Sequence, residues 1–116
     1  MKTTTLYRPV GQRELDLLAA SDYKKWPPRL PEQPIFYPVT NEAYAIEIAS
    51  KWNTKDELNG SVGYVTRFEI DTEYLNQFEV QQVGGEIHAE YWIPAEELER
   101  FNRHIIGRIQ VIGKYE

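Results

Sequence analysis

Two glutamates and a histidine are the residues of this chain whose types and spacing could do chemistry. Residues 79–93 alternate in polarity on both sides of a glycine pair at positions 84 and 85. Two consecutive glycines suit the two-residue turn of a hairpin, because both central residues of that turn need positive φ. Counting outward from the turn places Glu79 directly opposite Glu90, with His88 on the same face.

Facing carboxylates repel each other by roughly 0.2–1 kcal/mol, and such a pair raises the pKa of one member. We therefore identify Glu90, His88 and Glu79 as candidate catalytic residues, with Trp92 on the same face. Two other interpretations stay open: a solvated outer face, or a bulge that breaks the count. The same three side chains are ordinary metal ligands, but no spacing motif supports a metal site and we expect none.

The composition excludes several function classes. The chain has no cysteine, so disulfides, thiolate metal sites and a cysteine nucleophile are excluded. It lacks a phosphate loop, a dinucleotide-binding glycine motif, a serine nucleophile motif and a zinc-protease motif. The net charge of −5 argues against nucleic-acid binding. With no apolar run of membrane-spanning length and no signal-peptide pattern, we expect a cytoplasmic location without membrane association.

The first half of the chain must supply the elements that position these residues. Residues 4–10 predict a strand carrying Arg8, and residues 11–21 predict a helix. The proline-rich segment 22–34 predicts an ordered loop pinned by Trp26 and Leu30. Residues 35–37 predict a short strand. A second helix is expected after a cap at Thr40 or Asn41, with its apolar stripe at Ala45, Ile48, Ala49 and Trp52.

The second half predicts a strand over 63–70, a short helical turn after Asp71, the hairpin, a helix from Pro94 and a strand over 105–112. On the hairpin we expect one face, with Phe78, Val80, Ala89 and Tyr91, to be buried. This order mixes hairpins with helical crossovers. It predicts a single α+β domain over 1–116, with a mixed or mostly antiparallel sheet and three helices.

Three segments in this order carry a family resemblance. They are 6–10 (Leu-Tyr-Arg-Pro-Val), 36–43 (Phe-Tyr-Pro-Val-Thr-Asn-Glu-Ala) and 90–98 (Glu-Tyr-Trp-Ile-Pro-Ala-Glu-Glu-Leu). The chain resembles small bacterial proteins labelled "ADP-ribosylation/crystallin J1", and the segments resemble the ADP-ribosyltransferase fold. In place of that fold's Ser-Thr-Ser motif, this chain has Tyr-Pro-Val-Thr at 37–40.

The resemblance implies roles for individual residues and NAD as a possible substrate. Arg8 would hold a phosphate of NAD, since its forked donors suit that group. Tyr37 or Thr40 would support the nicotinamide side, with Trp92 in the same binding face. Glu90 would stabilise the cationic sugar that forms as nicotinamide leaves, and His88 would position the acceptor.

A second hypothesis is a non-catalytic protein-interaction module or homodimer. Its basis is the proline loop and an aromatic surplus that includes Tyr23, Trp26, Tyr44 and Trp92. The two hypotheses differ in geometry. The enzyme requires Arg8 and Glu90 to line one cleft, whereas the module requires an exposed apolar surface.

Overall fold

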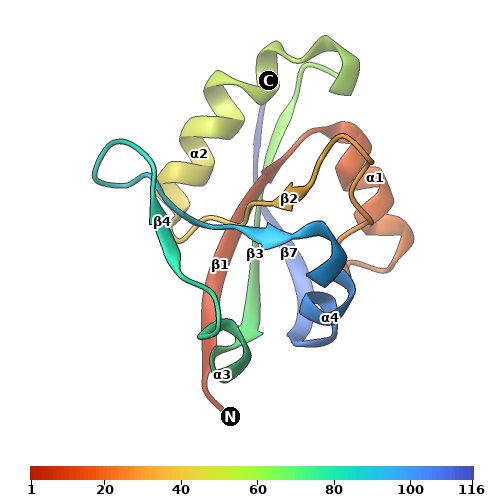
Figure 1. Ribbon diagram of the computed structural model, residues 1–116. Coiled ribbons are helices and arrows are strands. Elements are labelled where there is room, and N and C mark those ends of the chain that lie inside the picture. Colours follow the sequence, from red (N-terminus) through yellow and green to blue (C-terminus); the bar gives the residue numbers. More distant parts are fainter.

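The computed structural model describes residues 1–116 and has both helices and antiparallel strands, as the α+β prediction expects (Figure 1). The strands are β1 (Thr3–Val10), β2 (Ile35–Phe36), β3 (Gly63–Asp71), β4 (Val80–Gln82), β5 (Ala89–Tyr91), β6 (Ile93–Pro94) and β7 (Ile105–Tyr115). The α-helices are α1 (Gln12–Ala20), α2 (Glu42–Lys51), α3 (Thr72–Leu75) and α4 (Leu98–Arg103). Short 3-10 turns cover Asn53–Lys55, Glu57–Asn59 and Ala95–Glu97. No helix is both long and apolar enough to cross a bilayer.

The centre of the fold is an antiparallel sheet in the order β1-β3-β7. Single bridges extend it, because Val39 pairs with Tyr7 of β1 on one side and with Glu90 of β5 on the other. Strand β5 in turn pairs with β4. The segment around Val39 therefore joins the β4-β5 hairpin to the main sheet.

Strands β2 and β6 continue the same ladder. Phe36 pairs with Ile93, and Val39, three residues after Phe36, pairs with Glu90, three residues before Ile93. One antiparallel register therefore runs from 35–40 against 89–94. In this register Tyr37 faces Trp92. Because side chains alternate along strands, Phe36 and Ile93 share one side of the ladder, and Tyr37 and Trp92 the other.

The two faces of the sheet carry different layers. The larger core covers one face and joins Leu6, Phe68 and Ile109 of the sheet to Leu18 of α1 and Phe101 of α4. Helix α2 packs on the opposite face, where Ala45 and Ala49 contact Val39 and Val65. Gly63 allows this close packing, since a Cβ there would collide with the backbone of Ala49.

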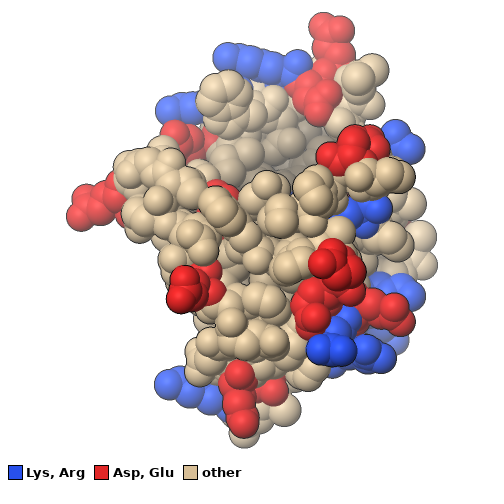
Figure 2. All heavy atoms as spheres, in the orientation of Figure 1, with Lys and Arg blue, Asp and Glu red and all other residues tan.

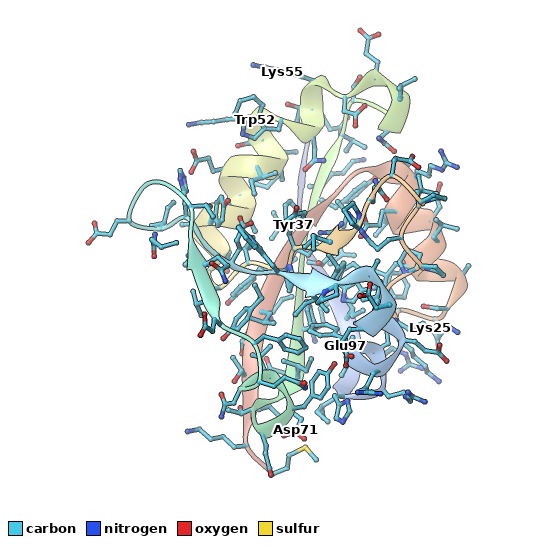
Figure 3. All side chains as sticks on the ribbon, viewed as in Figure 1. Lys25, Tyr37, Trp52, Lys55, Asp71 and Glu97 are labelled. Carbon is cyan, nitrogen blue, oxygen red and sulfur yellow. The ribbon has the colours of Figure 1, made fainter.

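Two predicted anchors are wrong. Leu30 is exposed, and only Trp26 pins the proline loop, buried against the rings of Phe36 and Phe68. Trp52 was expected on the apolar stripe of α2, but it is the C-cap residue, is 66% exposed and projects from one end of the molecule (Figure 3). At the C-cap the helix ends and its stripe no longer lies over the sheet.

Candidate functional site

The position of Glu90 is fixed by backbone bonds on both sides of it. The amide of Tyr91 donates to the carbonyl of Pro38 at 2.9 Å, and the amide of Thr40 donates to the carbonyl of Ala89 at 3.0 Å. The Thr40 hydroxyl donates to the same Ala89 oxygen. Glu90 therefore projects from the ladder on the face that carries α2.

The Glu90 carboxylate is buried and is held by neutral donors. The Tyr44 hydroxyl donates to Oε1 at 2.7 Å, and the indole Nε1 of Trp92 donates to Oε2 at 2.8 Å. Glu90 is 9% exposed and forms no salt bridge. Burying a carboxylate without a cation is costly unless its oxygens are hydrogen-bonded, and here each oxygen has one donor.

Helix α2 begins at a point that places Tyr44 against Glu90. The Asn41 side chain caps the helix by accepting from the Tyr44 amide at 2.8 Å. Its Nδ2 donates to the carbonyl of Ile87 at 2.8 Å, so the cap also ties α2 to the hairpin. Burial, and then the bond to Glu90, raise the pKa of Tyr44 to about 12.

His88 lies beside this pair and uses both ring nitrogens. The amide of Gly85 donates to Nδ1 at 3.0 Å, so Nε2 carries the hydrogen that is shared with Glu47 at 2.9 Å. This hydrogen bond lowers the pKa of Glu47 below its usual value. The imidazole also packs on the Tyr44 ring, with centroids 4.7 Å apart. We call Tyr44, Glu47, His88, Glu90 and Trp92 the Glu90 cluster.

An aromatic pair borders the cluster. The rings of Tyr37 and Trp92 meet edge to face, with centroids 6.5 Å apart. They are 40% and 44% exposed, so both rings reach solvent while Trp92 also donates to the buried carboxylate. Tyr37 lies near the centre of the face that carries β5 and β6 (Figure 3).

The predicted pairing of Glu79 with Glu90 is wrong. Gln81 lies opposite Glu90, and the strand begins at Val80, after the exposed Glu79. The turn has four residues, because the amide of Val83 donates to the carbonyl of His88. This longer turn shifts the pairing of the two strands by two residues. Each side chain therefore stays on its predicted face of the hairpin, but Glu79 and Glu90 no longer lie opposite each other.

The predicted burial of the hairpin is only partly correct, because Phe78 and Tyr91 pack against the larger core but Val80 does not. Val80 is 50% exposed, whereas Glu90 on the other side of the ribbon is buried. The reason is that the ribbon turns its Glu90 side toward α2, where the Tyr44 hydroxyl supplies a polar partner.

Arg8 lies away from the Glu90 cluster. Tyr7 shares a side of the ladder with Val39 and Glu90, so the neighbouring Arg8 points to the opposite face. There its guanidinium forms two bonds to Glu14 of α1, at 2.6 and 2.9 Å, and lies 4.6 Å from the Phe36 ring centre. The structure thus brings together Glu90, His88, Tyr37, Thr40 and Trp92, and leaves out Arg8 and Glu79.

Tyr44 and Glu47 are site residues that the sequence pattern did not identify. They lie one helical turn apart on α2, at a spacing that places two side chains on one helix face. Two polar side chains on one helix face, beside an apolar stripe, could have indicated that Tyr44 and Glu47 belong to the site. What the sequence lacked was the ladder register that sets β5 beside this face of the helix.

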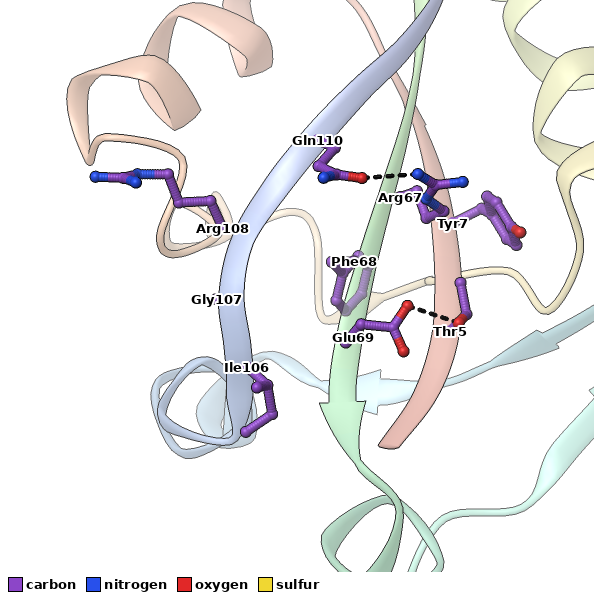
Figure 4. Close-up of a pocket in the computed structure, with 9 residues that line it drawn as sticks. All are labelled: Thr5, Tyr7, Arg67, Phe68, Glu69, Ile106, Gly107, Arg108 and Gln110. Carbon is purple, nitrogen blue, oxygen red and sulfur yellow. Dashed lines mark hydrogen bonds between the residues drawn. The ribbon is translucent and has the colours of Figure 1, made fainter. Parts of the chain in front are cut away.

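Surface pockets lie elsewhere. A depression of about 460 Å³ lies on the part of the sheet that α2 leaves open, lined by Thr5, Tyr7, Arg67, Glu69 and Gln110 among others (Figure 4). Its polar groups largely bond to one another, as in the pairs Arg67–Gln110 and Thr5–Glu69. No three carboxylate, imidazole or thiolate side chains lie close enough together to hold a metal ion.

Comparisons with known proteins add nothing to this geometry. No protein-family model, curated protein or solved structure matches the chain significantly.

Proposed function

We propose that the chain is a protein-interaction domain whose Glu90 cluster binds an arginine or lysine side chain of a partner protein. One observation carries this proposal: a buried carboxylate without a countercharge lies beside two half-exposed aromatic rings. A guanidinium or ammonium group placed there would supply the positive countercharge that the Glu90 carboxylate lacks.

The electrostatics of the cluster favour a cation. Glu47 adds a second carboxylate next to Tyr44, and its nearest ammonium group is the exposed Lys51, 3.9 Å away. Such exposed pairs contribute little, so they do not neutralise the site. The net charge of −5 would also steer a basic partner toward the protein.

The aromatic pair favours a cation that is part of an organic side chain, which can pack on the rings. The faces of Tyr and Trp rings attract cations, by about 0.5–1 kcal/mol at exposed sites and about 2 kcal/mol where water is excluded. A planar guanidinium can stack on Trp92 while donating to the carboxylate next to it. Figure 2 shows charged side chains mainly around the rim of this face of the molecule, with a largely uncharged centre.

The same geometry disfavours NAD, which the family resemblance implied as a substrate. Arg8 would have to bind a phosphate of NAD, but its side chain lies on the other face and is bound to Glu14. A diphosphate next to Glu90 and Glu47 would meet two carboxylates that are offset only by the exposed Lys51 beside Glu47. Binding of a basic side chain has no such obstacle.

Calorimetric titration with matched small molecules tests the proposal. N-acetylarginine amide should bind the protein, whereas N-acetylcitrulline amide, which has nearly the same shape but no charge, should not. Glu90→Gln should weaken arginine binding about tenfold, as expected for losing one charge-assisted contact. Glu86→Gln removes the same charge from the exposed hairpin turn and should leave binding unchanged.

Two results would contradict the proposal. One is equal binding of the arginine and citrulline compounds, which would show that charge is not recognised. The other is saturable NAD binding that Glu90→Gln abolishes, which would favour the nucleotide-binding hypothesis instead.

A further inference from the structure

A second candidate site lies on the opposite face of the sheet, between the start of α1 and the proline loop. A pocket of about 290 Å³ there is lined by three arginines, Arg8, Arg13 and Arg29, and by one carboxylate, Glu14. The four groups sum to a charge of +2 in a chain whose net charge is −5. Such a local excess of positive charge is unexpected in an acidic protein, and we call this site the arginine pocket.

Two of these charges already offset each other. Arg8 and Glu14 form a bidentate ion pair, and Arg8 also donates to the carbonyl of Tyr37. Arg29 uses only Nε, which donates to the carbonyl of Ile35, while Arg13 is exposed and has no side-chain partner in the protein. The terminal guanidinium nitrogens of Arg29 and the whole guanidinium of Arg13 are therefore free to bind a ligand.

The backbone adds to the positive potential. Helix α1 has nine residues and begins after Gly11, which offers no side-chain cap. The amides of the first turn consequently have no partner within the helix, and they carry the positive end of its dipole. Burial, and then the nearby Arg8 guanidinium, lower the pKa of Arg29.

We propose that the arginine pocket binds a small phosphate monoester, with the phosphate held by Arg13, Arg29 and the first turn of α1. Leu17, Pro27 and Leu30 provide apolar surface for a short carbon chain. The volume of the pocket is at the small end for ligand sites, so a nucleotide is not expected to fit.

This site is independent of the Glu90 cluster. The two lie on opposite faces of the sheet and share no side chain. Either proposal can therefore fail without affecting the other.

A titration followed by backbone amide NMR, at constant ionic strength, tests the pocket. Glycerol 3-phosphate should give saturable shifts at Arg13, Glu14 and Arg29, and inorganic phosphate should give weaker shifts at the same amides. Arg13→Gln should weaken binding about tenfold while leaving the fold intact, because this exposed side chain has no partner to lose. Arg103→Gln, which removes an exposed arginine from α4 outside the pocket, should leave binding unchanged.

Three outcomes would overturn the proposal. The absence of saturable shifts with glycerol 3-phosphate at about 20 mM would show that the pocket does not bind phosphate esters. Equal weakening by Arg13→Gln and Arg103→Gln would show that only the overall charge matters. Binding of unesterified phosphate with higher affinity than glycerol 3-phosphate would indicate an inorganic-anion site instead.

Discussion

Replacing Glu14 by alanine should destabilise the fold strongly, because it leaves the buried guanidinium of Arg8 without a countercharge. Breaking a buried ion pair from one side costs about 3–5 kcal/mol. The Arg8 side chain is 11% exposed and that of Glu14 is 23% exposed, so water can partly solvate the orphaned charge. We therefore expect about 3 kcal/mol, at the lower end of that range.

The assay is urea unfolding followed by tryptophan fluorescence, supported by a thermal scan. At roughly 4 °C per kcal/mol for a domain of this size, the melting temperature should fall by about 12 °C. Asp16→Ala is the control, since Asp16 lies on the same helix but is exposed and bonds only to Gln12.

A paired substitution separates the ion pair from simple packing. Arg8→Met combined with Glu14→Leu removes both charges and keeps apolar bulk, so it should cost less than the sum of the two single changes. A loss below about 1 kcal/mol for Glu14→Ala would refute the reasoning. It would mean that Arg8 is solvated in solution and available to bind a ligand.

Three further predictions concern packing and titration. Gly63→Ala should cost about 1–3 kcal/mol in urea unfolding, because β3 and the backbone of Ala49 must separate. Since folding raises the pKa of Tyr44 to about 12, its contribution to stability should be lost as pH rises from about 10 through 12. Glu90→Gln should lower that pKa, as read from the tyrosine ring carbons by NMR, and an unchanged value would rule out the hydrogen bond. Folding lowers the pKa of Glu47 from its ordinary 4.5, so its stabilisation should be present above that pH and lost below it as the carboxylate protonates. Glu47→Gln should therefore reduce the loss of unfolding free energy that the protein shows at acid pH. An unchanged loss in this variant would show that the contact with the imidazole is absent in solution.

Local pattern predicted much of the fold. The α+β class, the helix after Asn41 and the strand from Gly63 followed from periodicity and capping, because both depend on residues close in sequence. The Asn41 cap is confirmed by its bond to the Tyr44 amide. Such features need no knowledge of distant partners.

Features that depend on distant partners could not be predicted. The hairpin register follows from the imidazole of His88 accepting the Gly85 amide across a four-residue turn, which a glycine pair alone does not reveal. Arg8 lies on the face of the sheet that α1 covers, where it pairs with Glu14, six residues further along the chain. Recognising that pair requires knowing which side of the sheet α1 covers, and this is a property of the packed core.

The indole proton of Trp92 gives the most direct test of the central claim, since it donates to the buried carboxylate of Glu90. We would assign this proton by its loss in Trp92→Phe and follow it in NMR spectra as N-acetylarginine amide is added. We predict a saturable shift of this signal, with no shift from the citrulline compound and a much weaker one in Glu90→Gln. An indole signal that does not move at arginine concentrations up to about 100 mM would contradict it. That concentration lies well above the Kd of roughly 6–30 mM expected if a cation–π contact and one charge-assisted contact together contribute about 2–3 kcal/mol.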